Sequence, residues 1–319
     1  MKVLITGING FVASHFAKLL IDEGHEVIGT SRWTEDDFRI RDIKDKIIIV
    51  PMDLNDSWSC LSTIKKHKPD WISHLAAQSY VQDSFIYPAE TIRTNTLGTL
   101  NLLEAIRLNK NINYNPIVHI CSSSEVYGLV KEEDVPIKET QPFNPSNPYA
   151  VGKVGEDMLA LMYWTNYQIK TIRTRMFTHT GWGRTMLSAE CNFARQIALI
   201  EKGMQAPIVY HGNLNSIRTW ADVRDAVKAY YLLFEKGEPG EAYNIGGNIT
   251  KKIEEVLDYL LSLSSVEIGK NLDPKLLRPY DVTLQIPDCS KFKKLTRWHA
   301  VYSFEETMKE VLSFWRHYV

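Results

Sequence analysis

Apolar segments alternate with amphipathic ones along the first half of the chain. Residues 2–6 form a short apolar, β-branched run, and residues 11–23 carry apolar side chains at helical spacing up to Gly24, a typical helix stop. Strands that alternate with helices at such spacing predict an α/β fold, with a doubly wound parallel sheet covered by helices on both faces. Further strands are expected at 26–30, 46–51, 71–75 and 116–121, and further helices at 58–67 and 89–109.

The second half of the chain has a less regular pattern. No repeat, low-complexity segment or linker divides the two halves. We therefore expect one compact two-lobed unit in which the chain crosses between the lobes more than once. The pattern predicts helices at 149–165, 192–202, 222–236 and 304–318, and strands at 170–175 and 241–245.

A glycine loop follows the first predicted strand and opens the first predicted helix. Gly7, Gly10 and Ala13 stand three residues apart, in the pattern G-x-x-G-x-x-A. Glycines at these positions permit a tight turn and a close backbone approach, so that a pyrophosphate can lie at the positive helix N-terminus. The strand, loop and helix context favours dinucleotide binding over a plain strand-to-helix turn.

The end of the second predicted strand bears on the choice of cofactor. Sites for NAD usually carry an acidic residue there for the ribose 2′-hydroxyl, whereas this chain has Thr30, Ser31 and Arg32. Two hydroxyls and a guanidinium suit a 2′-phosphate, so NADP is the favoured cofactor and NAD the alternative. Asp53 follows the third strand, where it either reaches the adenine amino group or caps a helix.

Tyr149 and Lys153 stand one helical turn apart on the same face of a predicted helix. A nearby ammonium favours the phenolate, so we expect the pKa of Tyr149 to lie below about 10 and the phenol to exchange a proton with a substrate hydroxyl. The serines before Glu125 end a buried strand, where doubly wound sheets bind their ligands. The alternative is a packing tyrosine beside an exposed lysine.

Composition and charge narrow the possible partners. The 319 residues carry 37 Lys and Arg against 38 Asp and Glu, a net charge of −1, which argues against nucleic acid and acidic membranes. No apolar run approaches the ~20 residues of a membrane span, and no signal-peptide pattern is present. The four cysteines lie far apart without a CxxC pair, so we expect no metal site, reduced thiols and a cytoplasmic protein.

Several motifs together resemble one enzyme family along nearly the whole chain. TGINGFVASH, HLAAQS, SSSEVYG, PYAVGK, IRTWADVRDAV and YNIGG stand in the order typical of extended short-chain dehydrogenases/reductases of the nucleotide-sugar epimerase/dehydratase group. Within that group HLAAQSYVQDSF, KETQPFNPSNPYAVGK and LRPYDV are similar to GDP-mannose 4,6-dehydratases and to the related GDP-4-keto-6-deoxymannose reductases.

The resemblance implies two domains and a cofactor site. The expected Rossmann domain covers 1–175 with returns near 216–246 and 281–297, and a smaller α/β nucleotide-sugar domain covers 176–215, 247–280 and 298–319. The expected cofactor-binding residues are Gly7, Asn9, Gly10, Phe11, Val12, Arg32, Asp53, Leu54, Leu75, Ala76, Ala77, Tyr149 and Lys153.

The resemblance also implies the catalytic residues. Ser123 matches the serine that accompanies Tyr149 and Lys153, and Glu125 matches the dehydratase glutamate that removes the C5 proton. Ser124 is expected to help proton delivery at O6. Simple 4-epimerases usually carry a small residue where Glu125 stands, although Glu125 has the alternative of a supporting or solvated carboxylate, since the reductases also keep a glutamate there.

For the substrate contacts, some positions match the family pattern and others depart from it. Arg218, Arg278 and Asp281 match positions near the nucleotide diphosphate, where each alone could instead form a surface ion pair. The family usually reads FNH where this chain has Phe177-Thr178-His179, and the following TGWG is closer to the reductases. The expected substrate-binding residues are Ser79, Ser84, Thr178, His179, Asn192, Arg218, Arg278 and Asp281.

The function that these features favour is an NADP-dependent GDP-hexose 4,6-dehydratase. A GDP-4-keto-6-deoxyhexose reductase is the second hypothesis, and a C4 dehydrogenase or epimerase is the third. The intact Tyr-Lys pair argues against a non-enzymatic dinucleotide sensor. A homodimer or homotetramer is expected through helices 89–109 and 149–165, with Leu97, Leu100, Leu159 and Met162 as candidate contacts that could equally face the sheet.

Overall fold

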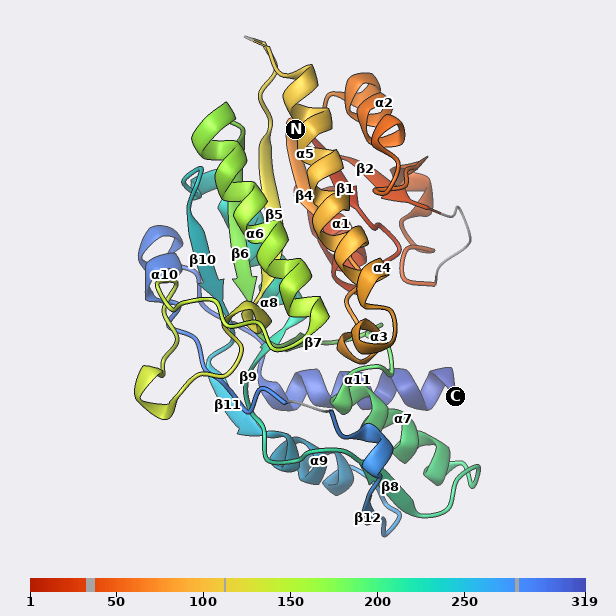
Figure 1. Ribbon diagram of the computed structural model, residues 1–319. Coiled ribbons are helices and arrows are strands. Elements are labelled where there is room, and N and C mark those ends of the chain that lie inside the picture. The colour runs from red at the N-terminus through yellow and green to blue at the C-terminus, as the bar shows by residue number, and fades with distance from the viewer. Residues whose placement is uncertain (33–37, 112, 279–280) are drawn as a thin grey trace.

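The computed structural model describes residues 1–32, 38–111, 113–278 and 281–319 and contains a large and a smaller lobe (Figure 1). The large lobe is built on a parallel sheet of seven strands in the order β10-β6-β5-β4-β1-β2-β3, which confirms the predicted fold class. The strands are β1 Lys2–Thr6, β2 Glu26–Ser31, β3 Ile47–Pro51, β4 Trp71–His74, β5 Ile117–Ser123, β6 Lys170–Met176 and β10 Ala242–Ile245.

Both faces of this sheet are covered by helices. Side chains alternate along β1, so that Val3 and Ile5 join the apolar core on one face and Leu4 joins the core on the other. The first face is covered by α1 Phe11–Asp22 and α8 Val223–Lys236, with α10 Ser290–Thr296 beside them. The second is covered by α2 Ser57–His67, α5 Gly98–Asn109 and α6 Pro148–Tyr167.

The helix predicted at 89–109 is divided. It consists of α4 Pro88–Ile92, the π-helical segment η2 Arg93–Leu97 and α5. Asn95 lies buried within η2, where its side chain accepts a hydrogen bond from the Gln78 backbone nitrogen at 2.8 Å and donates one to the Gln78 carbonyl at 3.0 Å. The interruption therefore holds the chain after β4 in place, a long-range contact that helical periodicity does not encode.

Within the described residues, the smaller lobe contains two short sheets and three main helices, packed around Trp220, Leu257 and Trp315. One sheet has the order β11-β9-β13 with β7 beside β9, and the other pairs β12 with β8. These elements are β7 His179–Thr180, β8 Ile208–His211, β9 Ile217–Asp222, β11 Ile249–Lys252, β12 Gly269–Leu272, β13 Leu284–Gln285, α7 Ala189–Glu201, α9 Ile253–Ser262 and α11 Phe304–Tyr318.

The chain passes between the lobes more than once. After β9 in the smaller lobe, α8 and β10 return to the large sheet, and β11 leads back again. The predicted domain boundaries stay a proposal. Short connecting elements are α3 Val81–Ile86, η1 Lys44–Lys46, η3 Ser124–Tyr127, η4 Glu132–Asp134 and η5 Pro274–Leu276. No helix in the described part of the chain is long and apolar enough to cross a membrane.

Asp157 forms a buried ion triad with two arginines of β6. Its carboxylate lies 2.8 Å from Arg173 Nη1 and 2.9 Å from Arg175 Nε, and its side chain is fully buried.

Asp157→Ala should lower the free energy of unfolding by about 3–5 kcal/mol, because two buried guanidinium groups lose their counter-charge. Urea unfolding measures the change. Glu23→Ala, which breaks the exposed pair with Lys228, should cost less than about 1 kcal/mol, and equal losses in both variants would contradict the argument.

Candidate active site

One cavity of about 1080 Å³ lies between the two lobes. Its walls include the carboxyl ends of the parallel strands β1, β2, β4, β5 and β6, where open α/β sheets bind ligands. The smaller lobe contributes residues from α7, β9 and β13. A molecule in this cavity therefore contacts both lobes at once.

The glycine loop has the shape of a phosphate cradle. Gly7 has a φ of +73°, and a Cβ atom there would lie 3.0 Å from Ala76 Cα, so only glycine fits without strain. The nitrogens of Gly7 and Ile8 both donate to the Thr30 carbonyl at 2.9 Å, which ties the turn to β2. Among the described residues, no side chain caps the start of α1, and buried Asn9 Oδ1 has no hydrogen-bond partner. An orphaned polar atom beside an uncapped helix N-terminus fits a dinucleotide pyrophosphate.

The far end of the cradle fits an adenosine. Arg32 is exposed at the cavity wall, next to half-buried Ser31. Asp53 also lines the cavity and accepts from the Asn55 nitrogen at 2.9 Å, whereas Asp56 caps α2 through the Trp58 nitrogen. Asp53 is therefore not the helix cap. The remaining predicted cofactor residues Phe11, Val12, Leu54, Leu75, Ala76 and Ala77 line the same cavity.

Tyr149 and Lys153 come from the start of α6. Asn147 caps this helix through the Ala150 nitrogen at 2.8 Å, which fixes Tyr149 in the first turn beside the end of β5. Lys153 Nζ donates to the Cys121 carbonyl at 2.9 Å and to Glu156 Oε2 at 2.9 Å. The phenol and the ammonium thus lie together at the cavity wall.

The pKa of Tyr149 differs from the sequence-based expectation. Burial raises it, and this effect outweighs the Lys153 charge and the hydrogen bond with Ser123, which both lower it. The prediction that the pKa of Tyr149 is lowered is therefore wrong for the protein by itself. The spacing of Tyr149 and Lys153 in the sequence carries no information about desolvation.

Glu125 is held by two amide groups. Its Oε2 accepts from Asn147 Nδ2 at 3.1 Å, and its Oε1 accepts from Gln285 Nε2 at 3.1 Å. The Glu125 backbone nitrogen donates to Ser123 Oγ at 3.2 Å, and Ser124 is buried at the same turn. Sequence reasoning missed Asn147 and Gln285. Only the position of Asn147 before Pro148 signals a cap, and Gln285 arrives from the smaller lobe without a local signal.

Two arginines, Arg218 and Arg278, line the same cavity. Arg218 is buried on β9, and its guanidinium is 3.9 Å from Asp281 Oδ1. Arg278 lies 3.8 Å from the same oxygen. Burial lowers the pKa of Arg218, while Glu125 and Asp281 act in the opposite direction. Asn213 and Ser216 occupy the other Asp281 oxygen at 2.8 and 3.0 Å, so Asp281 orients the arginines without fully neutralising them.

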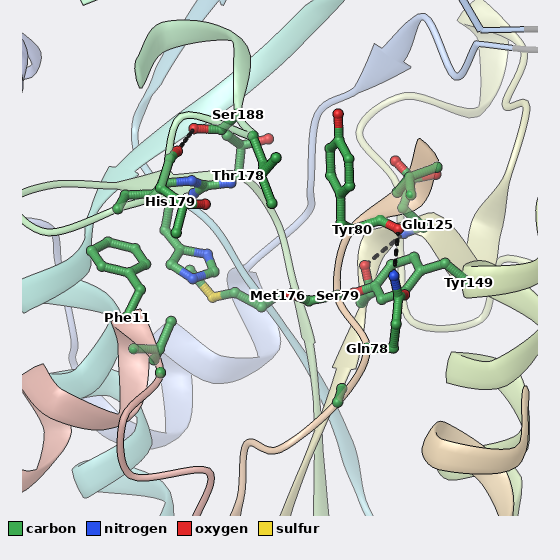
Figure 2. Close-up of a pocket in the computed structure, with 18 of the residues that line it drawn as sticks. Phe11, Gln78, Ser79, Tyr80, Glu125, Tyr149, Met176, Thr178, His179 and Ser188 are labelled. Atoms are coloured by element: carbon green, nitrogen blue, oxygen red, sulfur yellow. Dashed lines mark hydrogen bonds between the residues drawn. The ribbon is translucent and has the colours of Figure 1, made fainter. Parts of the chain in front are cut away.

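The other predicted substrate residues are spread over the cavity. Figure 2 shows His179 beside Phe11 of the glycine loop, with ring centroids 6.2 Å apart and an interplanar angle of 8°. His179 therefore lies beside the dinucleotide cradle. Ser84 does not join the site, because it is fully buried in α3 and donates to the Val81 carbonyl at 2.6 Å. Ser79, Thr178 and Asn192 line the cavity, and so do Tyr80 and Arg184, which the sequence did not suggest.

A dinucleotide cradle that opens toward a Tyr-Lys pair and a second, arginine-bearing lobe is the arrangement of the extended short-chain dehydrogenases/reductases that modify nucleotide sugars. The comparisons confirm the resemblance and narrow it. The chain belongs to the GDP-mannose 4,6-dehydratase family, whose sequence model matches residues 4–311.

Two curated relatives and a solved structure cover nearly the whole chain. The GDP-6-deoxy-D-mannose reductase of Pseudomonas aeruginosa is 30% identical over 315 residues, 98% of this chain and 97% of that protein. The GDP-mannose 4,6-dehydratase of Yersinia enterocolitica is 29% identical over 349 residues, 98% and 93% of the two chains. The RMD protein of P. aeruginosa, solved with NADPH, superposes with a TM-score of 0.84 at 28% identity over the full length of both chains.

Arg32→Ala tests the adenosine end of the cradle. If Arg32 binds a 2′-phosphate, the variant should lose about 1.5–3 kcal/mol of NADPH binding, the range for a charged hydrogen bond, and keep its NADH affinity. Isothermal titration calorimetry with each cofactor measures both values. Lys65→Ala removes an exposed charge on α2 outside the cavity and serves as the control. Equal losses for NADPH and NADH would refute the assignment.

Proposed function

We propose that the protein is an NADP-dependent GDP-hexose 4,6-dehydratase that converts GDP-mannose, or a related GDP-hexose, into a 4-keto-6-deoxy sugar nucleotide. The observation that carries this proposal is Glu125, held by Asn147 and Gln285 in the same cavity as Tyr149. Both amides donate to its oxygens, so the carboxylate is oriented as a proton acceptor. A carboxylate base beside the Tyr-Lys pair is what elimination across C5 and C6 requires.

In the first step, Tyr149, Ser123 and Lys153 act on the C4 hydroxyl. Tyr149 takes the proton from the C4 hydroxyl, Ser123 positions that oxygen, and the Lys153 charge stabilises the phenolate. The nicotinamide of the bound cofactor supplies the hydride chemistry at C4 and C6. The residues that would hold this cofactor are the glycine loop and Arg32, with NAD as the alternative to NADP.

In the second step, Glu125 and Ser124 bring about the loss of water across C5 and C6. A ketone at C4 acidifies the C5 proton, which Glu125 removes. Ser124, buried at the next turn of the wall, helps deliver a proton to O6, so that water can leave. The step balances: Glu125 takes one proton from C5, one proton is given to O6, and the C6–O6 bond breaks as water leaves.

The nucleotide diphosphate fits the wall with Arg218 and Arg278. Asp281 orients both guanidinium groups, and arginine pairs bind phosphate oxygens in a bidentate way. We propose that the GDP moiety lies here, in the smaller lobe, and that the hexose points toward Glu125.

A reductase is the second candidate. The 30% identity to a GDP-6-deoxy-D-mannose reductase over 98% of the chain favours it, and so does the TGWG segment at 180–183. In that reaction Tyr149 donates the proton to a C4 ketone, and NADPH is consumed. Incubation with GDP-mannose without added cofactor separates the two activities, because only a dehydratase yields a product lighter by one water.

We also propose a homodimer or homotetramer in the cytoplasm. Leu97, Val151 and Met158 are 49%, 43% and 46% exposed on η2 and α6, an apolar face suited to a helical interface. Leu100, Leu159 and Met162 pack against the core beneath the sheet instead. All four cysteines are free, which supports a reducing compartment.

Glu125→Gln tests the C5 base. The variant keeps the shape of the side chain but lacks the base, so dehydration of GDP-mannose should fall about 10²–10⁴-fold, while oxidation at C4 survives and reduced nicotinamide accumulates on the enzyme. Mass spectrometry of the product and the absorbance of bound cofactor measure the two steps. Tyr149→Phe is the matched comparison and should abolish both. Full dehydration by Glu125→Gln, or wild-type product without solvent deuterium at C5, would refute the dehydratase mechanism.

Met158→Arg tests the interface. A charge placed in the apolar face should shift the assembly toward monomers, as measured by light scattering at micromolar protein concentration. Met204→Arg, at a methionine that is 67% exposed in the smaller lobe, is the control and should leave the assembly unchanged. A wild-type protein that is already monomeric would contradict the proposal.

A further inference from the structure

A second carboxylate lies next to the site, and the proposed mechanism does not use it. Glu156 follows Lys153 by one turn of α6 and is 0% exposed. Its Oε2 accepts from Lys153 Nζ at 2.9 Å, whereas its buried Oε1 has no hydrogen-bond partner among the described residues. A buried carboxylate with one unpaired oxygen is destabilising by itself, so its presence beside Lys153 calls for a functional explanation.

We propose that Glu156 is a positioning residue that holds Lys153 in place and, by gaining or losing a proton, sets the charge that Lys153 presents to Tyr149. This inference rests on the proposed function, in which Tyr149 exchanges a proton with O4 of the sugar. It concerns the pH at which that exchange takes place.

The charges of the pair explain the effect. When Glu156 is ionised, the Lys153–Glu156 pair is neutral, and Tyr149 receives little help in forming a phenolate. When Glu156 is protonated, the pair carries a full positive charge that favours the phenolate. Such effects are strong here because Lys153 and Glu156 are buried and Tyr149 is half-buried.

Glu156 is the member of the pair that titrates. Burial raises the pKa of Glu156 to about 7, although the Lys153 ammonium acts in the opposite direction. Burial opposes the charge on Lys153, but Glu156 and Tyr149 raise the pKa of Lys153 on balance. Lys153 therefore stays charged, and the net charge of the pair changes near neutral pH.

The other titratable groups around the pair do not share this behaviour. Burial lowers the pKa of His74 on β4 and of His119 on β5 to about 3, so both rings are neutral. Burial raises the pKa of the Cys121 thiol on β5 and of the Tyr230 phenol on α8. Asp157, the neighbour of Glu156 on α6, is paired with Arg173 and Arg175.

Glu156→Gln separates the charge of Glu156 from its shape. The amide oxygen still accepts from Lys153, but the negative charge is absent, so the phenolate of Tyr149 becomes easier to form. The part of the pH profile of kcat/KM with GDP-mannose that lies above the pKa of Glu156 should move to lower pH by about one unit, whereas below that pKa, where wild-type Glu156 is already protonated, the profile should stay unchanged. Glu156→Asp restores the charge and should return the profile toward that of the wild type. Glu104→Gln, a partly exposed carboxylate on α5, is the matched control and should leave the profile unchanged.

The two proposals fail in different ways. If the protein is a reductase, the basic limb for the 4-keto substrate should show the same shift, because Tyr149 must then be protonated. A wild type that turns over neither substrate overturns the proposed function.

Infrared difference spectroscopy tests the Lys153–Glu156 pair without turnover. The carbonyl band of a buried carboxylic acid should vanish on alkaline titration of the wild type and be absent from Glu156→Gln. An unchanged pH profile in an active Glu156→Gln, or a wild type without that band, overturns the role of Glu156.

Discussion

Helix α6 buries three charged side chains against the parallel sheet, and the geometry of the site depends on how these charges are compensated. Asp157 pairs with Arg173 and Arg175 on β6, which fixes the middle of the helix to the sheet. Lys153 pairs with Glu156 and donates to the Cys121 carbonyl of β5. Because an uncompensated buried charge costs several kcal/mol, these contacts leave the helix little freedom to rotate or slide. The first turn, with Tyr149, is therefore held at the carboxyl edge of the sheet.

The smaller lobe supplies site residues that the large sheet lacks. The glycine loop and the Tyr-Lys pair belong to the large lobe, but Gln285 and Arg218 come from the short strands β13 and β9, which pair with each other. One edge of the smaller sheet thus orients the Glu125 carboxylate, and its neighbouring strand supplies a phosphate-binding guanidinium. Proton transfer and nucleotide binding are consequently linked through a single pair of strands.

The sequence predicted the large lobe well because each of its elements has a strong local signal. Apolar runs such as 2–6 and the glycine loop define β1 and α1 by themselves. Short elements of the smaller lobe, such as β13, were missed because they are defined by pairing with distant strands. The site residues divide in the same way: Tyr149 and Lys153 have a motif, whereas Gln285 has none. Desolvation of Tyr149 and burial of Glu156 were also invisible, because they depend on the three-dimensional surroundings.

The hydrogen bonds of Glu125 bear on the choice between the two candidate reactions. Two amide N–H groups point at its two oxygens, so the carboxyl group is held in one orientation from both sides. Reduction of a C4 ketone requires a proton donor, which Tyr149 supplies, and it requires no base at C5. Elimination of water requires a base at C5, and a carboxylate fixed from both sides meets that need.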